Sequence, residues 1–182
     1  MDARPGPRVL VAVASRHGAT AELAVALARD LERSPDTGSA VCLPVAQAPD
    51  PAGYDAVVLG SAVYAGRWLE PARAWAMGHL GRLRERPVWL FSSGPIGAPP
   101  FPPDEPHDVA VLGRLLGSTG HRLFPGRLDP ARLDVGERAV VTAMRAPVGD
   151  FRDWPSVTAW AAEIAAVLAA GRQTAPATAP PG

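Results

Sequence analysis

The sequence predicts a single α/β domain in which helices cover both faces of a parallel sheet. The chain has 182 residues, 47% hydrophobic and 20% charged, which is enough to build a core within one domain. Short, continuous apolar runs alternate along it with segments that carry apolar residues at helical spacing. Because continuous apolar strands are typical of parallel sheets buried on both faces, we expect three layers, α/β/α.

Five strands are expected, each a short run rich in Val, Leu or aromatic residues. They span residues 8–14, 39–43, 54–61, 86–92 and 121–128. The first, with the sequence RVLVAVA, is apolar throughout after its opening arginine, and the last has the weakest apolar pattern. Polar, Gly- and Pro-containing segments separate these runs, as expected for loops.

Five helices are expected between and after these strands. They span residues 21–31, 69–83, 108–118, 135–145 and 155–170. Pro71 and Pro155 suit the first turn of a helix, and Gly171 is expected to end the last one. We therefore expect one domain over residues 8–170, with a flexible N-terminus (1–7) and a disordered tail (171–182).

Composition excludes several classes of function. The 18 basic residues, all Arg, balance 18 acidic residues, and this argues against nucleic-acid binding, which needs a basic face. The one cysteine, Cys42, lies in an apolar run and is expected to be a buried hydrophobe. No apolar stretch approaches the roughly 20 residues of a membrane span, and the N-terminus lacks a secretory apolar region. We expect a cytoplasmic protein.

The loop after the first strand is a candidate phosphate site, since open α/β sheets bind ligands at the carboxyl ends of their strands. It reads Ser15, Arg16, His17, Gly18, Ala19 and Thr20. Two hydroxyls, N–H groups beside Gly18 and a helix N-terminus are the donors that a phosphate requires. Alternatively, Ser15 and Thr20 cap the helix, and Arg16 and His17 are solvated side chains. His17 shares no metal-ligand spacing with the other histidines, so no metal is expected.

Two further strand-end loops carry small and aromatic residues suited to a flavin ring. The residues that we expect to contact the ring are Gly60, Ser61, Ala62, Tyr64, Gly66, Trp68, Ser92, Ser93 and Gly94. Small residues let the backbone approach a ligand, and the aromatic residues offer flat apolar faces. Alternatively, Tyr64 and Trp68 serve packing alone. The Pro-rich residues 95–106 are expected to form one wall above the ring.

These loops resemble those of a known family. The pattern Ser15-x-x-Gly18-x-Thr20 after an apolar strand is similar to the phosphate loop of flavodoxins. The run YDAVVLGS at residues 54–61, followed by an aromatic-bearing loop, is similar to their third strand and first ring-binding loop. The resemblance covers residues 8–170. It implies a parallel sheet of order 2-1-3-4-5, with the phosphate of flavin mononucleotide (FMN) on the first loop.

The segment GDFRDW at residues 149–154, with the overall loop lengths, most resembles the menaquinone-dependent protoporphyrinogen oxidase branch. That branch is implied to dehydrogenate protoporphyrinogen with FMN and to pass the electrons to a quinone. Two departures separate this chain from the branch: no long basic, aromatic insertion follows Leu128, and the loop at 98–106 is unusual. FMN binding carries over from the resemblance, and the porphyrin substrate does not.

The sequence therefore favours an FMN-binding oxidoreductase or electron-transfer flavoprotein, without deciding whether the chain is an enzyme. The neutral net charge gives little long-range steering, and so favours a small-molecule or quinone acceptor over a redox partner protein. A flavin-free interaction or regulatory domain of the same fold is the alternative. A phosphoacceptor domain would need an Asp at the end of the third strand, where Gly60 and Ser61 stand. A hydrolase would need a nucleophile motif, and the sequence has none. No catalytic side chain is nominated.

Overall fold

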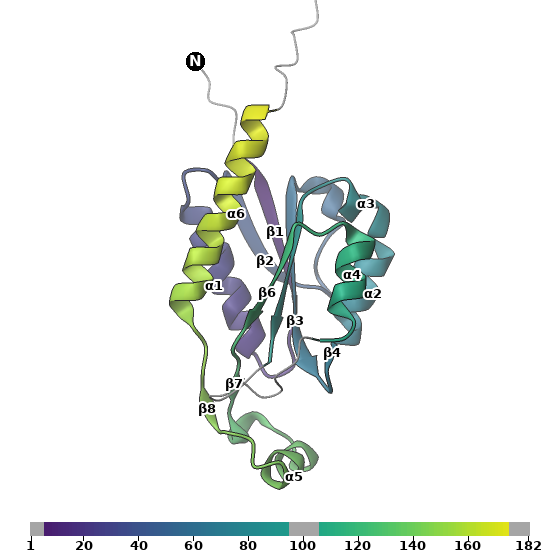
Figure 1. Ribbon diagram of the computed structural model, residues 1–182, viewed down its shortest axis with the longest axis vertical. Coiled ribbons are helices and arrows are strands. Elements are labelled where there is room, and N and C mark those ends of the chain that lie inside the picture. The colour runs from purple at the N-terminus through teal and green to yellow at the C-terminus, as the bar shows by residue number, and fades with distance from the viewer. Residues whose placement is uncertain (1–5, 95–105, 175–182) are drawn as a thin grey trace, which may run out of the picture.

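The computed structural model describes residues 6–94 and 106–174 and shows a central sheet between two helical layers (Figure 1). The five parallel strands are β1 (Arg8–Ala14), β2 (Ser39–Pro44), β3 (Ala56–Tyr64), β5 (Val88–Ser93) and β6 (Gly120–Phe124). They pair in the order β2-β1-β3-β5-β6. The sixth strand, β4 (Arg67–Trp68), pairs antiparallel with the end of β3. With β4 set aside, this is the expected order 2-1-3-4-5, and the predicted fold class is confirmed.

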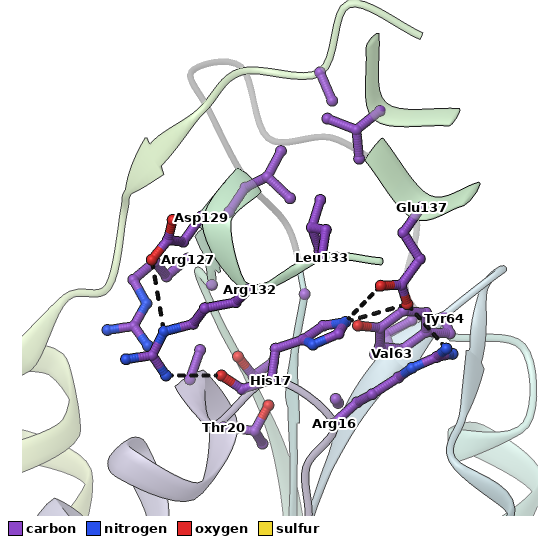
Figure 2. Close-up of a pocket in the computed structure, with 18 of the residues that line it drawn as sticks. Arg16, His17, Thr20, Val63, Tyr64, Arg127, Asp129, Arg132, Leu133 and Glu137 are labelled. Atoms are coloured by element: carbon purple, nitrogen blue, oxygen red, sulfur yellow. Dashed lines mark hydrogen bonds and ion pairs between the residues drawn. The ribbon is translucent and has the colours of Figure 1, made fainter. Parts of the chain in front are cut away.

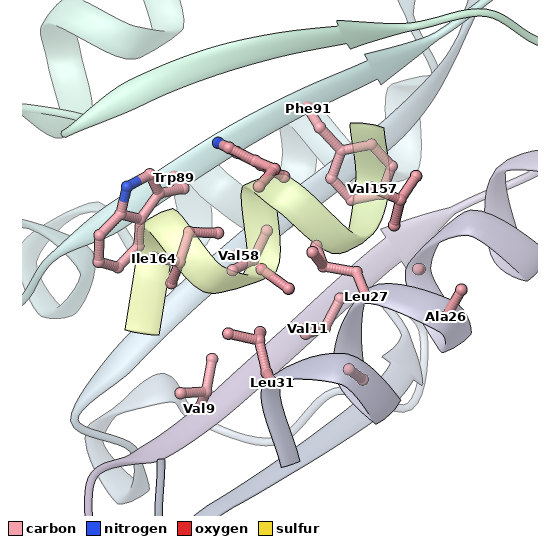
Figure 3. Packing of buried hydrophobic residues seen from close by; sticks show 14 of the residues in the cluster. Val9, Val11, Ala26, Leu27, Leu31, Val58, Trp89, Phe91, Val157 and Ile164 are labelled. Atoms are coloured by element: carbon pink, nitrogen blue, oxygen red, sulfur yellow. The ribbon is translucent and has the colours of Figure 1, made fainter. Parts of the chain in front are cut away.

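Helices cover both faces of the sheet because strand residues alternate between two cores. The helices are α1 (Ala19–Arg33) and α6 (Trp154–Thr174) on one face, and α2 (Glu70–Gly78), α3 (Leu80–Arg84) and α4 (Val109–Leu116) on the other. On β1, Val9 and Val11 join the core beneath α1 and α6, which Figure 3 shows, while Leu10 and Ala12 join the opposite core. Burial on both faces explains why the strands are continuous apolar runs.

Three aromatic rings fill the core where α6 crosses β5 and β6. The ring centroids of Phe91 and Phe124 are 6.0 Å apart, and the Trp160 centroid lies 6.2 Å and 5.5 Å from them. All three pairs are arranged edge to face, the arrangement that the ring quadrupoles favour. The first aromatic of this cluster, Phe91, also constrains its neighbouring strand. A Cβ atom at Gly60 would lie 2.0 Å from the Phe91 ring.

Two predicted helix boundaries are wrong. The helix expected at 69–83 is divided at His79, whose backbone leaves the helical region (φ −114°, ψ 17°). The last helix continues through Gly171 to Thr174, because that glycine does not adopt the positive φ that ends a helix. By contrast, Gly117 has φ 66° and ends α4. A glycine within a helix costs only about 1 kcal/mol, so its presence alone does not stop one.

Smaller elements extend the chain beyond the carboxyl edge of the sheet. They are β7 (Arg127–Leu128), η2 (Pro130–Arg132), α5 (Val135–Ala143) and β8 (Gly149–Asp150), with a further short turn η1 (Pro51–Gly53) elsewhere. In Figure 1, α5 lies apart from the helical layers, next to the strand ends. The antiparallel pairing of β7 with β8 brings the two ends of this excursion together.

A buried arginine joins this excursion to the main domain. The Arg152 side chain, 5% exposed, binds Asp150 at 2.6 Å and Glu22 of α1 at 2.6 Å. The Arg152 guanidinium lowers the pKa of both carboxyls, and the Asp150 carboxylate, followed by Glu22, raises the pKa of Arg152. We call this arrangement the Arg152 bridge. It fixes β8 beside the first turn of α1.

Within the described residues, none of the helices has both the length and the apolar character needed to cross a membrane. The expected flexible N-terminus and disordered tail fall mainly on residues 1–5 and 175–182, and the expected Pro-rich wall on 95–105. These ranges lie outside the described residues.

We predict that Gly60→Ala destabilises the protein by about 1–3 kcal/mol, because the buried Phe91 ring has no room to move away from the added methyl group. Urea unfolding measures the change. Gly81→Ala is the control, since an added Cβ there meets no described atom within 4 Å. Equal stability of Gly60→Ala and wild type would show that the ring contact is not rigid.

Candidate functional site

A cavity of about 550 Å³ opens at the carboxyl edge of the sheet (Figure 2). All three predicted strand-end loops contribute to its lining. The predicted site residues that line it are Ser15, Arg16, His17, Ala19, Thr20, Ala62, Tyr64, Ser93 and Gly94. Loops separated by dozens of residues in sequence meet here because the parallel strands end at the same edge.

The first loop presents unused donors to this cavity. Gly18, at φ 89°, is the N-cap residue of α1, and within the described residues no side chain caps the helix. The Ser15 hydroxyl accepts a hydrogen bond from the Gly18 N–H at 3.2 Å, outside the first helical turn. Thr20 is 3% exposed, and its hydroxyl has no hydrogen-bond partner among the described residues. The helix N-terminus and this hydroxyl are therefore free to bind an anion.

The second and third loops form the neighbouring wall. Ala65 (φ 48°) and Gly66 (φ 71°) form the tight turn between β3 and β4, and this turn places Tyr64 at the cavity. The Arg16 guanidinium lies 5.3 Å from the Tyr64 ring centroid. Burial raises the pKa of the Tyr64 hydroxyl above its ordinary value. The backbone of Gly94 continues the wall.

Trp68 does not line the cavity, although the sequence predicts that it stacks on a ring. It is 2% exposed, and its Nε1 donates a hydrogen bond to the Ser92 hydroxyl at 2.7 Å. Ser92 in turn lies 2.8 Å from His121 Nε2. Ser61 accepts from the Leu69 N–H at 3.0 Å. The hydroxyls of Ser92 and Ser61 thus accept hydrogen bonds from the Trp68 indole and from the residue that follows β4, and none of the three predicted residues lines the cavity.

Three predicted glycines also lie outside the cavity lining. Gly60 provides room for the Phe91 ring. Gly66 provides the positive φ of the β3–β4 turn, and Gly18 provides that of the N-cap of α1. Their conformational freedom shapes the loops, while neighbouring residues form the cavity surface.

The opposite wall comes from a segment that sequence reasoning missed as part of the site. We call residues 126–146 the roof segment. Its lining residues are Gly126, Arg127, Leu128, Asp129, Arg132, Leu133, Gly136, Glu137, Val140, Val141, Met144 and Ala146. The sequence predicts a helix at 135–145, and the Asp134-x-x-Glu137 spacing of a capping box can be read from it. Nothing in that local pattern indicates that the helix faces the first loop.

Ion pairs join the roof segment to the first loop. Glu137 lies 3.0 Å from Arg16 Nη2 and 3.1 Å from His17 Nε2, and Figure 2 shows these contacts crossing the cavity. We call this arrangement the Glu137 clasp. The Asp134 backbone N–H, followed by His17 and Arg16, lowers the pKa of Glu137. These contacts favour the ionised form of Glu137.

A second contact brings positive charge to the first loop. Arg132 donates a hydrogen bond to the His17 carbonyl at 3.1 Å, and it is only loosely paired with Asp129 at 3.5 Å and Glu22 at 3.9 Å. Arg127 pairs with Glu22 at 3.0 Å.

The described residues contain no cluster of three His, Cys, Asp or Glu that could hold a metal ion. Burial raises the pKa of Cys42, remote from the cavity lining, to about 11.

We predict that Glu137→Gln speeds hydrogen exchange of amides in residues 133–144 at neutral pH, with Glu163→Gln, an exposed carboxylate on α6, as control. In wild type, the clasp is complete above the ordinary pKa of Glu137. It is lost as the pH falls through the lowered folded value, so exchange protection should fall there too. Equal exchange in the wild type and both variants would contradict a clasp that holds α5.

Comparison with known proteins gives a family and a fold. Residues 10–153 match the flavodoxin domain family. No match is found among curated proteins. A flavodoxin from the domain Archaea superposes with a TM-score of 0.62 at 13% identity, over 88% of this chain and 98% of that one. A mutant form of flavodoxin from Pseudomonas aeruginosa superposes with a TM-score of 0.56 at 15% identity, over 88% of this chain and 98% of that one.

A longer protein, rubredoxin oxygen:oxidoreductase from Desulfovibrio gigas, is also similar, with a TM-score of 0.62 at 13% identity. The superposition includes 94% of this chain but only 38% of the longer one. At such identities the structural likeness shows the fold alone. The family match, in contrast, extends over most of the chain and includes the first loop, the β3–β4 turn and the roof segment. The chain belongs to the flavodoxin domain family, and that membership implies FMN as its cofactor.

Proposed function

We propose that this chain binds FMN in the cavity at the carboxyl edge and acts as an FMN-dependent oxidoreductase or electron-transfer protein. The observation that carries the proposal is the first loop. Thr20, a residue that is 3% exposed, and an uncapped helix N-terminus face the same cavity. A phosphate provides acceptors for both, and the helix dipole favours its negative charge.

The phosphate would be held by Thr20, by Ser15 and by N–H groups of the first turn of α1. Arg132 lies against this loop, where it pairs with Asp129 at 3.5 Å and Glu22 at 3.9 Å, and its guanidinium would add positive charge beside the phosphate. The Arg16 and His17 side chains point to the clasp instead, as Figure 2 shows, and would contribute mainly their backbone.

The flavin ring would lie against the second and third loops. Tyr64 offers its half-buried ring, Ala62 leaves space, and Ser93 with Gly94 lines the other side. Trp68, Ser61 and Ser92 would act indirectly, because their hydrogen bonds hold the β3–β4 turn in place. FMN supplies the redox chemistry when bound, and the protein orients it and limits its contact with water.

A small-molecule or quinone acceptor fits this chain better than a redox partner protein. The net charge is zero, so electrostatic steering of a protein partner is weak. The roof segment also faces the cavity from outside the sheet. We propose the reaction no more narrowly, because the segment at 149–154 that resembles protoporphyrinogen oxidases contributes β8 and the Arg152 bridge, both structural. The cytoplasmic location stays a prediction.

We predict that Thr20→Val weakens FMN binding about 10- to 100-fold while riboflavin binding changes little. A hydrogen bond to a charged group is worth roughly 1.5–3 kcal/mol, and only FMN has the phosphate to receive it. Quenching of flavin fluorescence measures both affinities on the same protein. Equal losses for the two ligands would mean that the Thr20 hydroxyl does not contact phosphate, and the proposed orientation of FMN would be wrong.

A further inference from the structure

The turn between β3 and β4 places an alanine in a strained backbone conformation. Ala65 and Gly66 are the two central residues of the turn, and both have positive φ, at 48° and 71°. Positive φ is ordinary for glycine and uncommon for a residue with a Cβ atom, so the strain lies at Ala65. Such a residue persists only where the surrounding structure holds it. The contacts that hold this turn therefore help to decide where Tyr64, the last residue of β3, lies.

Two consecutive residues at the start of α4 hold the turn from outside. The His107 N–H donates a hydrogen bond to the Gly66 carbonyl at 3.0 Å. The Asp108 carboxylate accepts a hydrogen bond from the Trp68 N–H, and its two oxygens lie 3.3 Å and 3.2 Å from that nitrogen. One contact is thus made to the turn itself, and the other to β4, directly after the turn. We call this pair of contacts the α4 anchor.

Asp108 makes its contact in place of a local one. It occupies the N-cap position of α4, where an aspartate side chain usually accepts an N–H of its own first helical turn. Over the described residues, its carboxylate makes no such capping bond and instead reaches Trp68, 40 positions earlier in the sequence. A capping residue whose side chain is directed to another segment indicates a role beyond the stability of its own helix.

The helix behind the α4 anchor gives it a fixed base. Val109, Leu112 and Leu116 of α4 are buried in the core on this face of the sheet. Tyr64 lines the cavity, whereas neither residue of the anchor does. The anchor therefore acts on a ligand in the cavity through the turn that it holds.

We propose that Asp108 is a positioning residue for the flavin ring, and that it acts through the β3–β4 turn. The inference rests on the proposed function, in which Tyr64 lies against the ring. By accepting the Trp68 N–H, the carboxylate keeps the turn in its strained conformation and Tyr64 at the cavity wall. Without this acceptor the turn relaxes, and the ring no longer meets a wall that is ordered before it arrives.

The property required at position 108 is hydrogen-bond acceptance. The nearest guanidinium nitrogen of Arg73 lies 3.6 Å from the Asp108 carboxylate, which is longer than a hydrogen bond, and the Asp108 side chain is 21% exposed. An asparagine offers the same acceptor without the charge. The conservative variant therefore separates positioning by the hydrogen bond from an effect of the charge.

The test is the binding of riboflavin, which has the flavin ring and no phosphate, followed by quenching of its fluorescence. Asp108→Ala should raise the Kd of riboflavin and that of FMN by the same factor, about fivefold, because only the ring side of the site is loosened. Asp108→Asn should keep the wild-type affinity. Asp55→Ala is the matched control, since the Asp55 carboxylate also accepts a backbone N–H, that of Arg8 at 2.7 Å, at the opposite edge of the sheet.

Hydrogen exchange of the Trp68 amide in flavin-free protein reports the α4 anchor itself. Faster exchange and weaker riboflavin binding in Asp108→Ala, with neither change in Asp108→Asn or Asp55→Ala, support the proposal. Unchanged riboflavin affinity in Asp108→Ala overturns it, as do equal losses in Asp108→Ala and Asp108→Asn, which would make the charge decisive. A loss for FMN alone overturns it by placing the effect at the phosphate. A wild type that binds neither flavin contradicts the proposed function, and with it this role for Asp108.

Discussion

Parallel strand pairing is the constraint on which the rest of this structure depends. Because β1, β3 and β5 run in the same direction, their carboxyl ends meet at one edge, and the loops that follow them must face one another. Burial on both faces makes this arrangement stable, since each strand contributes side chains to two cores. The cavity follows from the topology, and the identities of the loop residues decide what it can bind.

The second determinant is the attachment of the roof segment. An excursion of about twenty residues with few buried side chains has little core of its own, so polar contacts must hold it in place. The Arg152 bridge fixes one end, and the Glu137 clasp fixes the helix to the first loop. Both arrangements use charge pairs near the N-terminal turn of α1, the same turn that would receive the phosphate. Cofactor binding and roof position are therefore physically adjacent, with Arg132 between them.

Local patterns predict most of the fold because each element carries its own signal. The predicted and observed bounds of β1 agree to the residue, since six continuous apolar residues after Arg8 are typical of a buried strand. The roles of Trp68 and Gly60 could not be predicted in the same way. Whether Trp68 stacks on a ligand or packs depends on Ser92, and the need for glycine at 60 depends on the Phe91 ring. The Arg152 bridge joins residues 130 positions apart, and no local pattern encodes such a contact.

The central claim is that FMN binds with its phosphate at the N-terminus of α1, and NMR titration of this 19.0 kDa protein tests it most directly. Adding FMN to the isotopically labelled protein should shift the backbone amides of residues 15–20 and of Tyr64 and Ala65, saturating at one FMN per chain. Riboflavin should shift the amides of Tyr64 and Ala65 and leave those of residues 15–20 nearly unchanged. No saturable shift at high micromolar FMN, or shifts that avoid residues 15–20, would contradict the account.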